Sequence, residues 1–207
     1  MVVAPAAPVL VVIGIHREEL VFGREVAAGL APDEAEVLEI PDGLSGRRPR
    51  PDQCFRYGLA HEALYLQLLP HVLGRHRLLV DLHAGIDRDG PCADLMCGDA
   101  VLAERLQARL HESTGAPAAG VPVAAGVPMA GVRVIRLGSS DAVPTRTVIP
   151  ERIWHNPAFL YLCMEIYLSD DGSARPQAVA LARRLIGLAA QCVVCGGDAV
   201  AAPDCSC

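Results

Sequence analysis

Apolar runs typical of buried strands alternate along the chain with stretches of helical spacing. Residues 9–15 form a continuous apolar run rich in β-branched side chains, which is typical of a parallel strand covered by helices on both faces. Residues 19–30 then place apolar side chains at broadly helical spacing, and a glycine and a proline end that pattern. Further strands are predicted at residues 36–40, 77–83, 93–97, 132–137 and 159–168.

Helical patterns fill most of the remaining intervals. They cover residues 58–73 and 99–111, and a final helix after residue 173 places Val179, Leu181 and Leu185 toward the core. Gly85 is expected to end the strand before it. We therefore predict a single α/β domain over residues 1–190, with a mixed, mostly parallel sheet flanked by helices, followed by a cysteine-rich tail over residues 191–207.

Composition and charge narrow the function. The chain has 207 residues, 52% of them hydrophobic and 20% charged, which is too apolar for a disordered protein. No apolar run reaches the length of a membrane span, so no membrane partner is expected. The net charge is −6 and all 18 basic residues are arginines, which excludes lysine Schiff bases and the phosphate-binding P-loop. An acidic chain also argues against nucleic-acid binding.

The eight cysteines are expected to be reduced thiols or metal ligands. The apolar N-terminal segment lacks the basic region of an export signal, which indicates a cytoplasmic protein. Near the C-terminus, four cysteines could hold a structural metal ion or belong to a mobile, thiol-rich tail; they are Cys192, Cys195, Cys205 and Cys207.

Two groups of polar residues follow apolar strands, which is where ligands bind in open α/β sheets. His16 and Glu19 lie at the turn after the first strand, and Asp81 and His83 lie at the end of a later one. Two imidazoles and one carboxylate are the ligands of a typical catalytic zinc site with one open position. The alternative is that His16 and Glu19 cap a helix while His83 is a hydrogen-bonded histidine at a strand end. The other five histidines are interpreted as surface or packing residues.

This pattern, His16-x-x-Glu19 with Asp81-Leu82-His83 downstream, resembles the zinc signature of the aspartoacylase and succinylglutamate desuccinylase family, within the zinc carboxypeptidase superfamily. The similarity in order and context covers residues 9–168. It implies a zinc carboxypeptidase-like fold in which His16, Glu19 and His83 bind Zn²⁺. It further implies a second glutamate as general base, arginines that hold a substrate carboxylate, and hydrolysis of a neighbouring amide.

The chain departs from the family pattern at two places. Arg17 and Glu18 stand where the family usually has Gly-Asn, which places charged, bulky side chains at the mouth of the site. The family's Asp-x-Asn-Arg segment has no exact counterpart in residues 50–57, where Arg50 and Arg56 are the nearest matches for substrate binding. The preceding loop also carries Arg47 and Arg48, and this positive charge favours the binding of an anion.

Strand parity identifies a candidate general base. In residues 159–167 the odd positions Tyr161, Cys163, Glu165 and Tyr167 share one face, and Glu165 is the only charged residue there. A carboxylate in such an apolar strand is exposed, paired or functional, because an unpaired buried charge is costly. A structural ion pair with an arginine is one alternative. We favour the base, with Tyr161 or Tyr167 donating a hydrogen bond to an oxyanion.

Together with these residues, the resemblance implies a zinc-dependent hydrolase that cleaves the amide of an N-acyl amino acid or small peptide with a free carboxylate. One alternative is an N-formylglutamate amidohydrolase-like activity on a smaller acyl group. Another is a non-catalytic binding protein that keeps the fold and the metal, which the charged Arg17 and Glu18 would favour. The sequence specifies neither the acyl group, nor the amino acid, nor the oligomeric state.

Overall fold

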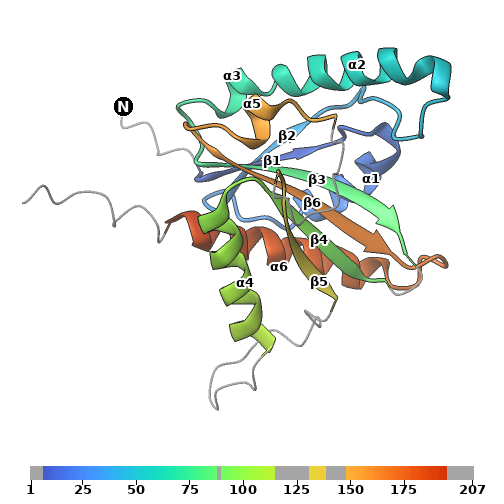
Figure 1. Ribbon diagram of the computed structural model, residues 1–207. Coiled ribbons are helices and arrows are strands. Elements are labelled where there is room, and N and C mark those ends of the chain that lie inside the picture. Colours follow the sequence, from blue (N-terminus) through green and yellow to red (C-terminus); the bar gives the residue numbers. More distant parts are fainter. Residues whose placement is uncertain (1–6, 88–89, 115–130, 139–147, 195–207) are drawn as a thin grey trace, which may run out of the picture.

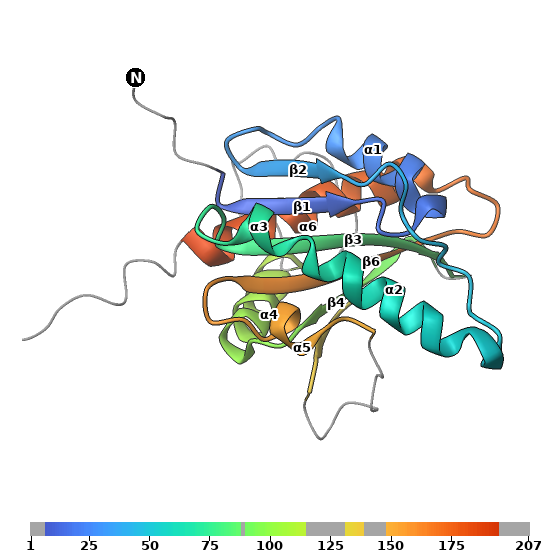
Figure 2. The ribbon, with the colours of Figure 1, turned by 90° about the horizontal axis from the view of Figure 1, so that it is seen from above.

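A six-stranded sheet forms the centre of the protein (Figure 1). The computed structural model describes residues 7–87, 90–114, 131–138 and 148–194. The strands are β1 Val9–Ile13, β2 Ala35–Glu39, β3 Leu78–Ile86, β4 Cys92–Cys97, β5 Val132–Arg136 and β6 Leu160–Leu168. Their order across the sheet is β2-β1-β3-β6-β4-β5, and Figure 2 shows this sequence of neighbours from above.

The sheet is mixed but mostly parallel. Strands β2, β1, β3 and β6 run parallel to one another, whereas β4 pairs antiparallel with β6 and parallel with β5. The predicted single-domain α/β architecture is therefore confirmed.

Helices cover both faces of the sheet (Figure 1). Side chains of α1, α4 and α6 join one apolar cluster, and side chains of α2, α3 and α5 join the cluster on the opposite face. The helices are α1 Leu20–Ala27, α2 Cys54–Leu66, α3 Leu69–Val72, α4 Ala100–Thr114, α5 Glu151–Trp154 and α6 Arg175–Val194. Short 3-10 turns at Arg17–Glu19 and Pro51–Gln53 lead into α1 and α2.

The central strand β1 shows why the sheet forms. All five of its residues are buried, with Val9, Val11 and Ile13 in the α6-side cluster and Leu10 and Val12 in the α2-side cluster. Each such side chain contributes about 1.5–3 kcal/mol by leaving water. A strand that packs on both faces therefore has a continuous apolar sequence, as predicted.

Helix α6 is the longest helix in the described part of the chain and passes beneath the sheet in Figure 1. It is long and apolar enough to cross a membrane, but 61% of its most apolar window is buried inside the protein. Those contacts make it a core helix. It continues to Val194, so the first residues of the predicted tail are helical and Cys192 is buried. Cys195, Cys205 and Cys207 lie outside the described residues.

Two predicted elements differ from the structure. The helix predicted at residues 58–73 begins at Cys54 and is divided, with α3 starting at Leu69. The division lies just before Pro70, whose ring would clash with a carbonyl of the preceding turn. The prediction that Gly85 ends its strand was wrong, because β3 continues to Ile86 and pairs Gly85 with Tyr167. A Cβ at Gly85 would lie only 3.1 Å from Glu165 Oε1, so glycine allows this close approach.

The turn after β1 leads to the first candidate ligand and gives a test of the fold. Gly14 has a φ of +82°, and a Cβ there would lie 2.5 Å from the carbonyl oxygen of Ile40. We expect Gly14→Ala to destabilise the protein by about 1–3 kcal/mol in urea unfolding. The control is Gly187→Ala in α6, where nothing lies within 4 Å of the position of a Cβ. Alanine there should raise the free energy of unfolding by about 0.5–1 kcal/mol. Equal stability of the Gly14→Ala and wild-type proteins would contradict this view of the turn.

Candidate active site

The three predicted metal ligands converge at one point. His16 follows β1, Glu19 lies in the 3-10 turn before α1, and His83 belongs to β3. Oxygen Oε1 of Glu19 lies 2.9 Å from His16 Nδ1, and Oε2 lies 2.9 Å from His83 Nδ1. One donor atom from each residue lies within 4.8 Å of the others, close enough to bind one ion. This is the convergence that the sequence predicted.

A buried carboxylate supports His83 from behind. Asp81 Oδ2 lies 3.0 Å from His83 Nε2 and also accepts hydrogen bonds from the hydroxyls of Tyr65 at 2.6 Å and Tyr161 at 2.9 Å. This arrangement fixes the ring of His83 and leaves Nδ1 directed at Glu19. The expected orientation of a ligand histidine by Asp81 is thus present in the structure.

Burial and charge act in opposite directions on these groups. Burial alone would lower the pKa of His83, but the charge of Asp81 and hydrogen bonds to Asp81 and Glu19 raise it well above its ordinary value. For Glu19, burial raises the pKa, but hydrogen bonds from His16 and His83 lower it overall. Without a metal, His83 therefore carries a proton between two carboxylates. A metal ion held by His83 Nδ1 would take the place of that proton.

Sequence reasoning interpreted His61 as a surface or packing residue, but the structure places it against His16. Its Nδ1–H donates to the carbonyl of Tyr57 at 2.8 Å, and its Nε2 lies 3.3 Å from His16 Nε2. With a metal ion at His16 Nδ1 in place of the hydrogen bond from Nδ1 to Glu19, a neutral His61 would accept from His16 Nε2–H. Tyr65, one turn further along α2, was missed as well. The spacing His61-x-x-x-Tyr65 puts both on one face of a helix and was the available signal.

Glu165 lies beside the candidate ligands, on the face of β6 that strand parity predicted. It pairs in register with His83 of β3, and its Oε1 lies over Gly85. Burial raises its pKa, and the charges of Glu19 and Asp81 raise it further against the opposing effect of His83. A carboxylate with a raised pKa is a better base near neutral pH.

The alternative of an ion pair at Glu165 has no support in the described part of the chain. The arginine on this side of the sheet, Arg133, instead binds Asp94 through two hydrogen bonds of 2.6 and 2.7 Å. Asp94 also accepts from the hydroxyl of Tyr167 at 3.1 Å, and it pairs in register with Glu165.

The two tyrosines predicted to contact substrate have other partners. The hydroxyl of Tyr161, a residue only 1% exposed, donates to Asp81, so Tyr161 supports the site from the interior instead of facing a substrate. Tyr167 donates to Asp94, as described above. The prediction failed for Tyr161 because parity gives the face of a strand but not the depth of a side chain beneath its covering helix.

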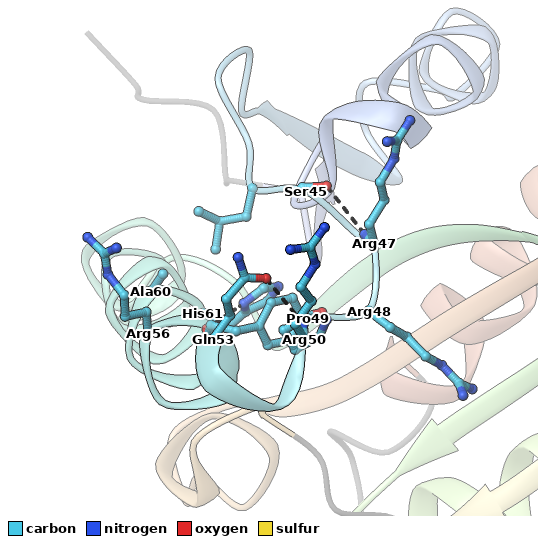
Figure 3. Close-up of a pocket in the computed structure, with 11 residues that line it drawn as sticks. Ser45, Arg47, Arg48, Pro49, Arg50, Gln53, Arg56, Ala60 and His61 are labelled. Carbon is cyan, nitrogen blue, oxygen red and sulfur yellow. Dashed lines mark hydrogen bonds between the residues drawn. The ribbon is translucent and has the colours of Figure 1, made fainter.

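The predicted substrate arginines line a cavity of about 670 Å³ between the loop after β2 and the start of α2. Arg50 and Arg56 lie there with Arg47 and Arg48, and His61 connects the cavity to the metal ligands. In Figure 3 the guanidinium groups of Arg47, Arg48 and Arg56 point in different directions. None of these four arginines forms an ion pair with another described residue, so they are available to an anionic ligand. We call this cavity the arginine pocket.

Glu18, which departs from the family pattern, anchors residues 44–50 after β2, which we call the arginine loop. Its carboxylate accepts hydrogen bonds from Ser45 Oγ at 2.8 Å and the Gly46 amide at 3.1 Å. The backbone hydrogen bond from Gly46 is the largest contribution that lowers the pKa of Glu18 to about 2. Gly46 in turn packs on His16, since a Cβ there would lie 3.0 Å from the imidazole Cγ. The charged residue at the mouth of the site thus holds the loop in place.

A second possible ligand group shares His83 and consists of Asp81, His83 and Cys163. It is less suited to a metal, because burial raises the pKa of the Cys163 thiol and Asp81 already accepts from two tyrosines. Metals bind the deprotonated thiolate. The first group keeps its Nδ1 atoms and a carboxylate directed at one point, so we regard it as the candidate metal centre.

Comparison with known proteins finds similarity at the level of structure. Murine aminoacylase 3 matches 91% of this chain and 65% of its own, with 14% identity and a TM-score of 0.46. A candidate metallopeptidase from Shewanella denitrificans OS217 matches 91% of this chain and 74% of its own, with 15% identity and a TM-score of 0.44. The catalytic domain of CwlV, an N-acetylmuramoyl-L-alanine amidase from Bacillus (Paenibacillus) polymyxa var. colistinus, matches 89% and 92%, with 12% identity and a TM-score of 0.37.

No family model and no curated protein sequence matches the chain. The chain spans about 65% of the length of aminoacylase 3. Because all three TM-scores lie below 0.5, the function proposed below rests on the geometry of the site.

The role of Asp81 behind His83 can be tested directly. Asp81→Asn preserves shape but removes the charge that orients and polarises His83, so affinity for Zn²⁺ should fall about 10–100-fold. Competition with a chromogenic chelator measures that affinity, and circular dichroism reports whether the variant is folded. The matched control is Glu39→Gln, which removes an exposed carboxylate bound to Arg24 and should leave the affinity unchanged. A folded Asp81→Asn protein with wild-type affinity would rule out this support.

Proposed function

We propose that the protein is a zinc-dependent hydrolase that cleaves the amide bond of an N-acyl amino acid or small peptide bearing a free carboxylate. The observation that carries this proposal is the convergence of His16, Glu19 and His83 beside Glu165, a carboxylate with a raised pKa. Arginines that form no ion pair with another described residue line the adjacent cavity. A metal, a base and an anion-binding pocket are the parts that hydrolysis of such an amide requires.

The ligand atoms suit zinc. Two imidazole nitrogens and one carboxylate oxygen about 2.1 Å from a tetrahedral zinc ion would lie about 3.4 Å apart. The two 2.9 Å contacts involve different oxygens of Glu19, and the three donor atoms lie within 4.8 Å of one another, so binding would need modest side-chain movements. A zinc ion bound there supplies an activated water molecule and polarises the scissile carbonyl.

The chain's own residues supply the proton transfer and the orientation of the substrate. Glu165 accepts a proton from the attacking water and returns it to the departing amine. The arginine pocket binds the substrate carboxylate, with Arg50 and Arg56 as the proposed contacts. His61 and Asp81 hold the two ligand imidazoles from the side away from Glu19.

Experiment can distinguish two other functions from this one. N-formylglutamate hydrolysis would use the same groups on a smaller acyl substituent. A non-catalytic binding protein would keep the metal without turnover, but the position of Glu18 does not favour it, because this side chain bonds the arginine loop and does not block the metal ligands.

Glu165→Gln separates the catalytic role from a structural one. The amide keeps the shape of the side chain but cannot accept a proton, so turnover of N-acyl amino acids should fall about 100-fold or more. Zinc content and melting temperature should stay close to wild type, because no described arginine pairs with Glu165. An exposed carboxylate on α4 provides the control Glu112→Gln. Full turnover in folded Glu165→Gln protein would exclude Glu165 as the base, and a large loss of stability would instead support a structural ion pair.

A further inference from the structure

A second cavity, of about 550 Å³, lies on the other side of the arginine loop. It is enclosed by the start of α1, the end of β3, the end of β6 and the start of α6. Gly46 and Arg47 of the loop form the wall nearest the arginine pocket, and Arg47 lines both cavities. We call this second cavity the apolar pocket.

Most of the surface that lines the apolar pocket is apolar. Val21, Phe22, Ile86 and Leu168 contribute side chains, and Val21 and Ile86 are 60% and 69% exposed. Large apolar groups exposed in a concave surface are typical of a ligand-binding site.

The charged residues around the apolar pocket largely have partners within the protein. Arg175 binds Glu25 at 2.9 Å and also lies over the ring of Phe22. Glu18 is held by the arginine loop, as described above. Arg47, which also lines the arginine pocket, is the charged residue on this wall that forms no ion pair with a described residue.

The apolar pocket lies next to the groups that would act on an amide. Glu19, a candidate metal ligand, lines it, and so does Gly85, over which the Glu165 carboxylate lies at 3.1 Å from the position of a Cβ. The arginine pocket lies on the opposite side of Gly46 and Arg47. An amide at the candidate metal centre with its carboxylate in the arginine pocket would have the apolar pocket, across Gly46 and Gly85, open to its other half.

We infer that the apolar pocket binds the acyl part of the substrate, and that this acyl group is an uncharged chain of several carbons or an aromatic ring. The inference rests on the proposed function and specifies its substrate class. A cavity of about 550 Å³ is within the usual range for small-molecule sites and is much larger than a formyl or acetyl group requires.

A chain-length series tests the inference. The zinc-loaded protein is given N-formyl-, N-acetyl-, N-butanoyl-, N-hexanoyl- and N-benzoyl-L-glutamate, and kcat/KM is measured for each. Each methylene buried in the apolar pocket should raise kcat/KM about fourfold. Fastest hydrolysis of the formyl compound would overturn the inference and favour the deformylase alternative.

A variant links that preference to the apolar pocket. Val21→Trp fills the cavity from an exposed position on α1, so the ratio of kcat/KM for the hexanoyl and formyl compounds should fall at least tenfold. The control is Val101→Trp on α4, which is 52% exposed and lines neither cavity, and it should keep the wild-type ratio. An unchanged ratio in Val21→Trp would overturn the inference.

Binding measurements distinguish an incorrect assignment of the apolar pocket from an incorrect proposal of hydrolysis. Affinities of the same compounds are measured by calorimetry on zinc-loaded Glu165→Gln protein. Affinity that rises with chain length and falls when Val21→Trp is added would support the apolar pocket, even if the wild-type protein hydrolyses none of the compounds. Absence of hydrolysis with such binding would contradict only the proposed function. Affinity independent of chain length would overturn the pocket assignment.

Discussion

The parallel pairing of β1 with β3 sets the position of the candidate ligands. Ile13 lies opposite Leu82 in this register, so the residues that follow, including His16 and His83, emerge at the same edge of the sheet. A slip of one residue would turn His83 and Asp81 toward the apolar cluster beneath α6. The slip is unfavourable because it would separate buried Asp81 from Tyr65 and leave its charge among apolar side chains, so the packing around Asp81 helps to determine the geometry of the site.

Polar contacts then connect the site to the helix that covers it. Tyr65 of α2 and Tyr161 of β6 both donate to Asp81, and His61 of α2 contacts His16. Asp81 is fully buried, and such a charge is tolerated because His83 and two hydroxyls all contact its Oδ2 atom. The position of α2 over the sheet therefore depends on the same groups that orient the imidazoles.

Local patterns in the sequence predicted the sheet, the ligand group and the face on which Glu165 lies. Strand parity and the His16-x-x-Glu19 spacing are local patterns, so they can be recognised in the sequence without knowledge of tertiary contacts. The roles of His61, Tyr65 and Tyr161 were not predictable in this way, because each depends on how α2 packs on the sheet. The extension of β3 beyond Gly85 was also missed, since a glycine signals a break as readily as a close approach of side chains.

The most direct test of the metal centre is X-ray absorption spectroscopy of the protein loaded with one equivalent of zinc. The account predicts a first shell of nitrogen and oxygen only, at about 2.0–2.2 Å, with multiple-scattering features from two imidazoles. The double variant His16→Ala, His83→Ala should lose those imidazole features. A sulfur shell near about 2.3 Å in the wild-type protein would place the ion on cysteines such as Cys163 or those of the C-terminal segment, and it would contradict the assignment.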